Sequence, residues 1–111
     1  MGLTKSNLFT EEQNQLAAIA KAVAHPARIA IIQHIIKSKT CINNELVKEL
    51  GLAQATVSQH LKALKEVGII QGTIEGASIC YCIDSVIWDK MKNELAAFFE
   101  QSVSCSSENC C

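Results

Sequence analysis

The sequence predicts a mainly helical fold with one small β-hairpin, and three observations support this prediction. Apolar residues recur at helical spacing through most of residues 11–67. Residues 69–83 instead alternate and are rich in β-branched side chains, which is typical of a hairpin. One proline and five glycines among 111 residues are too few turn-forming residues for an all-β fold.

The first predicted helix covers residues 11–24, because Thr10 and Gln13 have the spacing of a capping box. Pro26 suits the first turn of a second helix, where its missing N–H costs nothing. We expect this second helix to end near residues 37–39. Its buried face is expected to consist of four isoleucines, Ile29, Ile32, Ile35 and Ile36.

A third helix is predicted over residues 43–50 and a fourth over residues 54–67, each stopped by a glycine, Gly51 and Gly68. Two helices joined by the short turn Gly-Leu-Ala and followed by a hairpin form a winged helix-turn-helix. In that fold the second helix of the pair enters the major groove of DNA.

The last helix is predicted to begin after a cap at Asp84 or Ser85 and to run to about residue 101. It carries more apolar surface than one small core can hide, which predicts an interface. The residues concerned are Ile87, Trp88, Met91, Leu95, Phe98 and Phe99.

The fourth helix has two distinct faces. Its core stripe consists of Val57, Leu61 and Leu64, with His60 packed beside it. The opposite side and its flanks offer amide, hydroxyl and ammonium groups that can bind base edges or phosphates. The predicted DNA-binding residues are Gln54, Ala55, Thr56, Ser58, Gln59, Lys62 and Lys65. A polar face on any solvated helix looks alike, but the flanking glycine turn and hairpin favour the DNA-binding interpretation.

The composition restricts the class of protein. With a net charge of −1, any contact with nucleic acid must rest on a local basic patch. No run of about 18 apolar residues and no signal pattern occur, so we expect a cytoplasmic protein without a membrane partner. No motif pairs a cysteine with a positioned base, and no glycine-rich phosphate loop occurs, so neither an enzyme nor an organic cofactor is indicated.

Residues 1–101 are expected to form the winged domain, and residues 102–111 a flexible, cysteine-rich tail. The tail holds three of the six cysteines. In a reducing compartment we expect free thiols rather than disulfides. Clustered cysteines in such a protein bind metal or sense redox state.

Three segments, in this order, resemble the ArsR/SmtB family of bacterial repressors: AVAHPARIAIIQHI, ELVKELGLAQATVSQHLKALKEVGII and EGASICYCID. The resemblance covers roughly residues 15–100. It implies a homodimer that pairs through its first and last helices and represses transcription by binding double-stranded operator DNA. It also implies release from DNA by metal or metalloid ions.

The chain departs from the family pattern at several positions. Ile42 and Asn44 stand where the family has the cysteines of its helix-three metal site, and the last helix contains no histidine for the family's zinc site. Ala53 replaces the usual serine cap of the fourth helix. Ala77-Ser78 stands at the wing tip, where arginine is usual.

Because the residues of both family metal sites are missing, the hypotheses about which ion or oxidant releases the protein from DNA rest on the cysteines. Three thiolates without histidine suit a three-coordinate ion such as arsenic(III) or antimony(III). The first predicted ligand set is Cys105, Cys110 and Cys111, which is similar to a cluster in family members that answer arsenicals. The alternative set is Cys41, Cys80 and Cys82. Two further hypotheses stay open: a thiol-based redox or sulfide sensor with the same fold, and a family member with no metal response.

Overall fold

The computed structural model describes residues 5–38, 45–75 and 78–104. It contains a short 3₁₀ helix, η1, and then five α-helices and a two-stranded hairpin, which confirms the predicted fold class. The elements are η1 (Lys5–Leu8), α1 (Glu11–Val23), α2 (Pro26–Ser38), α3 (Glu45–Leu50), α4 (Gln54–Glu66), β1 (Ile70–Glu75), β2 (Ser78–Ile83) and α5 (Ser85–Phe99).

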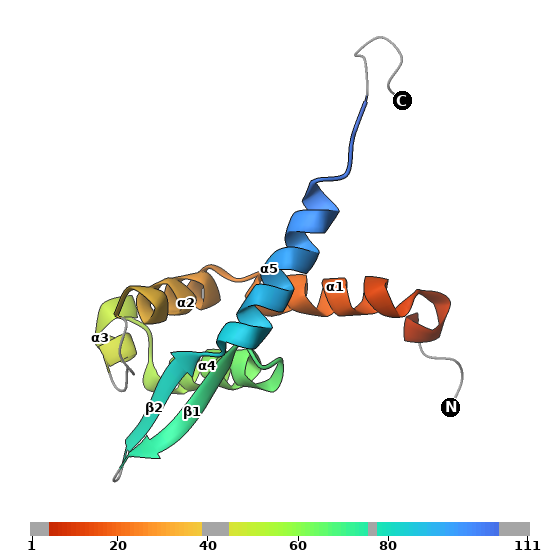
Figure 1. The fold of residues 1–111 in the computed structure, drawn as a ribbon. Coiled ribbons are helices and arrows are strands. Elements are labelled where there is room, and N and C mark those ends of the chain that lie inside the picture. The colour runs from red at the N-terminus through yellow and green to blue at the C-terminus, as the bar shows by residue number, and fades with distance from the viewer. Residues whose placement is uncertain (1–4, 39–44, 76–77, 105–111) are drawn as a thin grey trace.

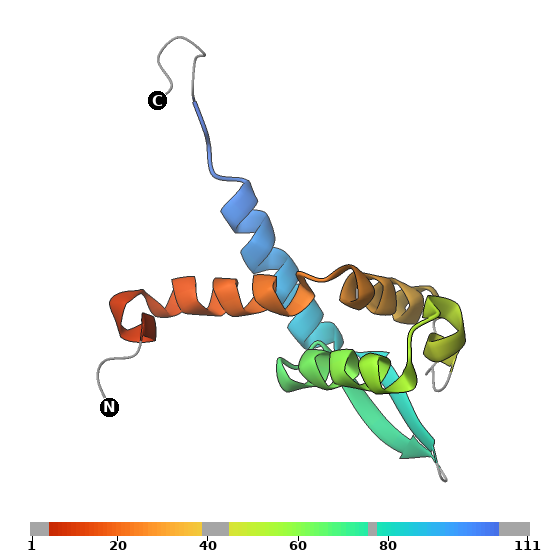
Figure 2. The same ribbon diagram turned by 180° about the vertical axis from the view of Figure 1, so that it is seen from behind.

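The elements form a body around α4 and two long helices that cross beside it. Helices α2, α3 and α4 pack together, and the hairpin lies against α2 and α4 (Figure 1). Helix α1 crosses α5, and the far ends of both helices project from the body in both opposite views (Figures 1 and 2). The hairpin, or wing, and the C-terminal end of α5 point in opposite directions.

Side-chain caps explain where the two crossing helices begin. The Thr10 hydroxyl accepts a hydrogen bond from the Gln13 backbone N–H, and the Thr10 N–H donates to the Gln13 side chain. This confirms the predicted capping box. At α5 the cap is Asp84, whose carboxylate accepts from the N–H groups of Val86 and Ile87. Both starts are therefore encoded locally.

A glycine makes the helix-turn-helix connection possible. Gly51 has φ +67°, the left-handed conformation that side chains with a Cβ disfavour. It follows the last residue of α3 directly, so it ends that helix and redirects the chain within three residues into α4.

The core lies where α4 meets α2, the start of the hairpin and α5. Its buried residues are Ala22, Ile31, Ile32, Ile35, Val57, Leu61, Leu64, Ile69, Ile70 and Met91. The predicted buried face of α2 is half wrong, because Ile29 and Ile36 are 47% and 48% exposed while Ile31 is fully buried. The helix turns Ile31, Ile32 and Ile35 inward, and Ile29 and Ile36 border an open groove beside α5.

The two strands of the wing pair antiparallel, and the register places Cys80 opposite Thr73 and Cys82 opposite Gln71. Residues 76–77 at the wing tip lie outside the described residues, so the departure from the usual arginine there is known from the sequence alone. The division of the chain at residues 101 and 102 also stays a prediction, since residues 105–111 are not described.

Among the described residues no single helix is long and apolar enough to cross a membrane. Helices α1 and α2 meet the criteria of length and composition only as a pair, and the chain bends by 84° between them.

Candidate nucleic-acid interface

One apolar stripe anchors α4 to the body. Val57, Leu61 and Leu64 are all buried, as predicted, and Leu64 has no exposed surface. These residues are spaced at three and four positions, so they fall on one side of the helix. The opposite side of α4 is left facing outward, and the whole length of the helix is in view in Figure 2.

The predicted DNA-binding residues lie on this outward side. Six of them are exposed, namely Gln54, Ala55, Ser58, Gln59, Lys62 and Lys65, and Thr56 is half-buried. None of these side chains is engaged in a hydrogen bond or ion pair with another residue, as far as the described part of the chain extends. Their amide, hydroxyl and ammonium groups are therefore available to an external partner.

The start of α4 has no side chain to satisfy its first N–H groups. Ala53 is the N-cap, with φ −62° and ψ 147°, and makes no side-chain cap hydrogen bond. The first turn of a helix has N–H groups without partners inside the helix. Groups of this kind attract anions such as phosphate. The missing serine cap thus leaves the N-terminus of α4 open to a phosphate.

A second contact ties α4 to the start of α2. The Arg28 Nε donates a hydrogen bond to His60 Nδ1 at 3.1 Å, and its guanidinium also donates to the Ala22 carbonyl at 3.1 Å. The His25 ring lies 4.4 Å from the His60 ring, and His25 Nδ1 accepts from the Ala27 N–H. His60 is thus a packed residue, as the sequence predicted, and His25 caps the start of α2. We call these three residues the His25–Arg28–His60 cluster.

A positive charge on the His60 ring is unfavourable inside this cluster. Burial, and then the neighbouring His25 and Arg28, lower the pKa of His60. The bond from Arg28 requires an unprotonated Nδ1, so neutral His60 carries its proton on Nε2. A protonated ring would lose this acceptor and would face the Arg28 guanidinium.

Arg28 was missed by the sequence analysis. A single arginine on a helix is usually a solvated charge, and nothing in the local pattern connects residue 28 with residue 60. The one signal in the sequence is its position in the segment AHPAR, which belongs to the stretch that resembles the ArsR/SmtB family.

The cysteines of the wing differ from each other. Cys80 is buried and disulfide-bonded, and Cys82 is a free thiol of intermediate exposure. The expectation of free thiols is therefore wrong for Cys80. The other predicted ligands, Cys41, Cys105, Cys110 and Cys111, lie outside the described residues.

Within the described ranges, no three histidine, cysteine, aspartate or glutamate side chains are grouped so that they could hold a metal ion. The described part of the chain therefore offers no complete site for an effector ion. The two predicted thiol sets both include residues beyond it.

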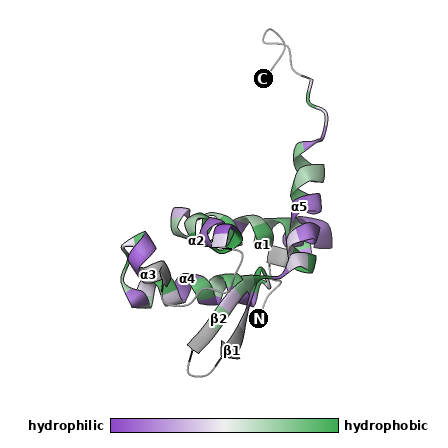
Figure 3. Ribbon diagram, turned by 60° about the vertical axis from the view of Figure 1, so that its left-hand side comes forward, coloured by the Kyte–Doolittle hydropathy of each residue, from purple (hydrophilic) through white to green (hydrophobic). Residues whose placement is uncertain are grey.

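Helix α5 shows the predicted excess of apolar surface. Met91 is buried, Trp88 and Leu95 are partly buried, and Phe98 and Phe99 are exposed. Figure 3 shows apolar residues on the turns of α5 that stand above the body. A groove of about 510 Å³ continues this surface between α1, α2 and α5, and Trp88, Ile29 and Ile36 are among its lining residues.

Residues 25–71 match the sequence model of a family described as bacterial regulatory proteins of the arsR family. This stretch carries the helix-turn-helix region of the ArsR/SmtB family of winged helix-turn-helix transcriptional regulators. Over 63 residues it is 41% identical to the HTH-type transcriptional repressor SmtB of Mycobacterium tuberculosis. The matched stretch is 57% of this chain and 46% of that repressor, so the chain spans about half of this relative's length.

The similarity to two solved structures extends beyond the matched stretch, to most of the chain. The crystal structure of Rv0081 from Mycobacterium tuberculosis has a TM-score of 0.60 and 25% identity, over 78% of this chain and 88% of that one. A winged helix-turn-helix domain from Mycobacterium bovis, described as homodimeric and as a possible ArsR-family regulator, has a TM-score of 0.63. It is 19% identical, over 96% of this chain and 97% of its own, and shows the fold alone.

The ArsR-family match from residue 25 to residue 71 contains the whole His25–Arg28–His60 cluster and all of α4. Strand β2 and α5, which hold the wing cysteines and the apolar surface, lie outside it. Helices α2, α3 and α4 thus all lie in the stretch that matches the arsR family model.

The His25–Arg28–His60 cluster makes the stability of the fold depend on pH. Since the pKa of folded His60 lies below the ordinary 6.5, the unfolded chain binds more protons near that pH. The contribution of His60 is therefore complete above pH 6.5 and is lost as the pH falls through the lowered value. Urea unfolding at pH 7.5 and at pH 5.5 should show a smaller free energy of unfolding at pH 5.5.

His60→Asn is the matched variant, because an amide oxygen can replace Nδ1 as the acceptor for Arg28 without titrating. Its free energy of unfolding should change less between the two pH values than that of the wild type. Equal changes in both proteins would mean that His60 does not titrate on unfolding in this range.

Proposed function

We propose that this chain is a transcriptional repressor that binds double-stranded operator DNA as a homodimer, with α4 in the major groove. The observation that carries this proposal is the exposed polar face of α4, which lies directly opposite the buried stripe of Val57, Leu61 and Leu64. In a winged helix-turn-helix the second helix of the pair enters the groove. The match of residues 25–71 to the arsR family supports the same role.

The chemistry of the outward face suits two kinds of DNA contact. Gln59 and Ser58 can hydrogen-bond base edges, which carries sequence preference. Lys62 and Lys65 supply the positive charge that attracts phosphates. The chain as a whole does not supply it, because its net charge is −1. The uncapped N-terminus of α4 adds backbone donors for a further phosphate.

A dimer follows from the apolar surface on α5. The exposed apolar surface here is larger than scattered surface residues account for. It consists of exposed Phe98 and Phe99, the groove beside Trp88, and half-exposed Ile29 and Ile36. We propose that α1 and α5 pair with the same helices of a second copy. The homodimeric domain from Mycobacterium bovis has the same fold, which supports this assembly.

The proposed effector is a thiophilic ion of the arsenic(III) or antimony(III) type, bound by Cys105, Cys110 and Cys111. Three thiolates are a suitable set for such an ion, and each must lose its proton to bind. The tail follows directly after α5, so gathering it around an ion acts on the helix that sets the spacing of the two α4 helices. The ion shifts the DNA equilibrium only by its different affinity for the two states.

The bonded sulfur of Cys80 favours a second candidate, a redox-responsive repressor. Two thiols and one hydrogen peroxide give a disulfide and two molecules of water, so a peroxide is a sufficient oxidant. Strand β2 packs against α2, so making or breaking the covalent bond at Cys80 changes a residue at the contact between the wing and the body. In this candidate the oxidised and reduced wings differ in DNA affinity.

Two substitutions on α4 separate base recognition from phosphate binding. On a duplex selected from a random-sequence pool, Gln59→Ala should lose about 1–3 kcal/mol of discrimination at one base position. Lys62→Ala should weaken binding to all sequences and reduce the salt slope by about 1. Lys21→Ala, an exposed lysine on α1, serves as the charge-matched control and should bind like the wild type. If no duplex is selected, or if all three variants bind like the wild type, α4 is not the DNA-reading element.

Sedimentation at micromolar concentration tests the dimer. Leu95→Glu should raise the dimer dissociation constant about tenfold or more, because an unpaired carboxylate in an apolar interface costs more than about 1.4 kcal/mol. Val86→Glu is the control, since Val86 is 75% exposed and lies on the other side of α5. A wild-type monomer, or equal effects of both substitutions, would refute the proposed interface.

Anisotropy of labelled operator DNA, titrated with arsenite and separately with peroxide, distinguishes the two effectors. Cys110→Ser with Cys111→Ser should keep DNA binding and abolish an arsenite response, which needs about 1.4 kcal/mol of coupling for a tenfold change. Cys80→Ser should keep any arsenite response and abolish a peroxide response. Cys82→Ser is the control on the same strand. An arsenite response that survives in the double variant moves the ion site to the set Cys41, Cys80 and Cys82.

A further inference from the structure

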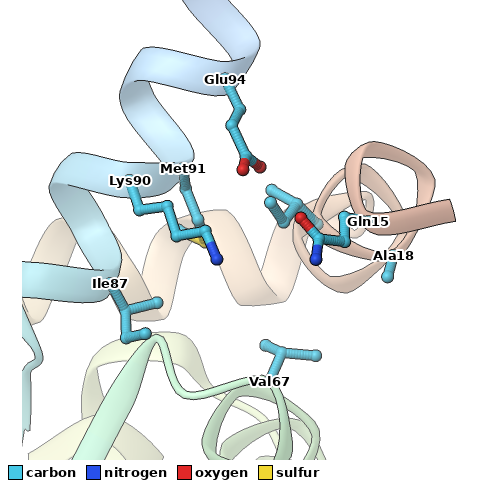
Figure 4. Close-up of a pocket in the computed structure, with 8 residues that line it drawn as sticks. Gln15, Ala18, Val67, Ile87, Lys90, Met91 and Glu94 are labelled. Carbon is cyan, nitrogen blue, oxygen red and sulfur yellow. The ribbon is translucent and has the colours of Figure 1, made fainter. Parts of the chain in front are cut away.

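A second cavity, of about 290 Å³, lies where α5 passes α1 and the end of α4. Its floor is apolar and includes Ile19, Val67 and Ile87. Three polar side chains surround the same space, Gln15 from α1 and Lys90 and Glu94 from α5 (Figure 4). An apolar pocket with a few convergent polar groups is the usual form of a small-molecule site.

The carboxylate of Glu94 is the decisive group. Its Oε2 atom is buried and has no hydrogen-bond partner among the described residues. Figure 4 shows the carboxylate directed toward the cavity. A buried carboxylate oxygen is unfavourable unless a donor, preferably a cationic one, satisfies it. Folding alone does not supply that donor here.

Lys90 does not supply it, although it lies one turn before Glu94 on the same helix. The ion pair recorded on α5 joins Lys92 to Asp89, at 3.8 Å. In Figure 4 the Lys90 ammonium points into the cavity, toward the space that the Glu94 carboxylate and the Gln15 amide also border. The cavity therefore presents an anionic group and a cationic group separately, over an apolar floor.

We propose that this cavity binds a small zwitterion with an apolar side chain, of the free α-amino acid class. The ligand's ammonium group would donate to Glu94 Oε2, and its carboxylate would accept from Lys90 Nζ and the Gln15 amide. Its side chain would cover Ile19, Val67 and Ile87. The cavity volume is at the small end of ligand pockets, which suits an amino acid rather than a nucleotide or a peptide.

The position of the cavity connects this ligand to DNA binding. Val67 caps the C-terminus of α4, and Ile87, Lys90 and Glu94 belong to the proposed dimer helix. An occupant would brace α4 against α5 and α1, so ligand and DNA would alter each other's affinity by the same factor. This coupling rests on the proposed function, whereas binding of the amino acid does not.

Calorimetric titration of the full chain with L-methionine and L-leucine tests the site in the absence of DNA. Saturable binding of at least one is expected, and Glu94→Gln and Lys90→Gln should each weaken it about tenfold, since each removes one charge-assisted bond. Glu100→Gln, at an exposed glutamate beyond the last turn of α5, should bind like the wild type. Urea unfolding shows whether each variant is folded before it is titrated.

Two analogues test the zwitterion directly. Isopentylamine is leucine without the carboxylate, and 4-methylpentanoate is leucine without the ammonium group, so both should bind more weakly than leucine. An amine that binds as tightly as the amino acid overturns the role of Lys90, and no saturable binding of either amino acid overturns the site. If Glu94→Gln changes only the dimer dissociation constant, Glu94 pairs with the second copy and the cavity is not a ligand site. Because these measurements contain no DNA, their failure is distinct from failure of α4 to bind an operator.

Discussion

The placement of α4 depends on its burial against α2, assisted by one polar contact between residues far apart in the chain. The Arg28 Nε donates to His60 Nδ1 across 32 residues of sequence, and the same guanidinium holds the Ala22 carbonyl at the end of α1. Arg28 therefore joins the end of α1, the start of α2 and the middle of α4. The rotation of α4 about its axis decides which residues face outward, so this contact also sets the candidate DNA surface. A hydrogen bond involving a charged partner contributes about 1.5–3 kcal/mol, while the apolar stripe beneath it supplies the larger part of the stabilisation.

Polar contacts of this kind define a geometry more sharply than apolar burial does. Val57, Leu61 and Leu64 tolerate small rotations of the helix, because van der Waals contact has little directional preference. The bond from Arg28 to His60 does not, since it weakens steeply away from linear geometry. The same bond requires a neutral imidazole, so the orientation of α4 depends on the protonation state of the His60 ring. A pH-dependent group thus lies directly behind the candidate DNA surface and not on it.

Helix α5 is shared by three surfaces, and this explains its unusual composition. Met91 faces the core, Trp88 and Leu95 border the large apolar groove, and Lys90 and Glu94 border the small cavity. These residues all lie within residues 88–95, about two turns of helix, so a slight rotation or shift of α5 changes all three surfaces together. A second copy on one flank and a ligand on the other would therefore influence each other through a single rigid element. The tail that carries Cys105 leaves from the end of the same helix.

Much of this protein was determined locally and could be predicted from the sequence. The capping box at Thr10, the proline start of α2, the glycine at residue 51 and the cap at Asp84 each act within a few residues, so helix boundaries followed directly. The outward face of α4 was also predictable, since a stripe of spaced apolar residues fixes the opposite side. What only the tertiary structure decided involves partners distant in sequence. Ile31 rather than Ile29 is buried, Arg28 reaches His60, Cys80 is bonded, and Glu94 is left without a donor. A helix that is apolar on several sides does not reveal which side its neighbours will cover, and a single charge does not reveal which distant group it will meet.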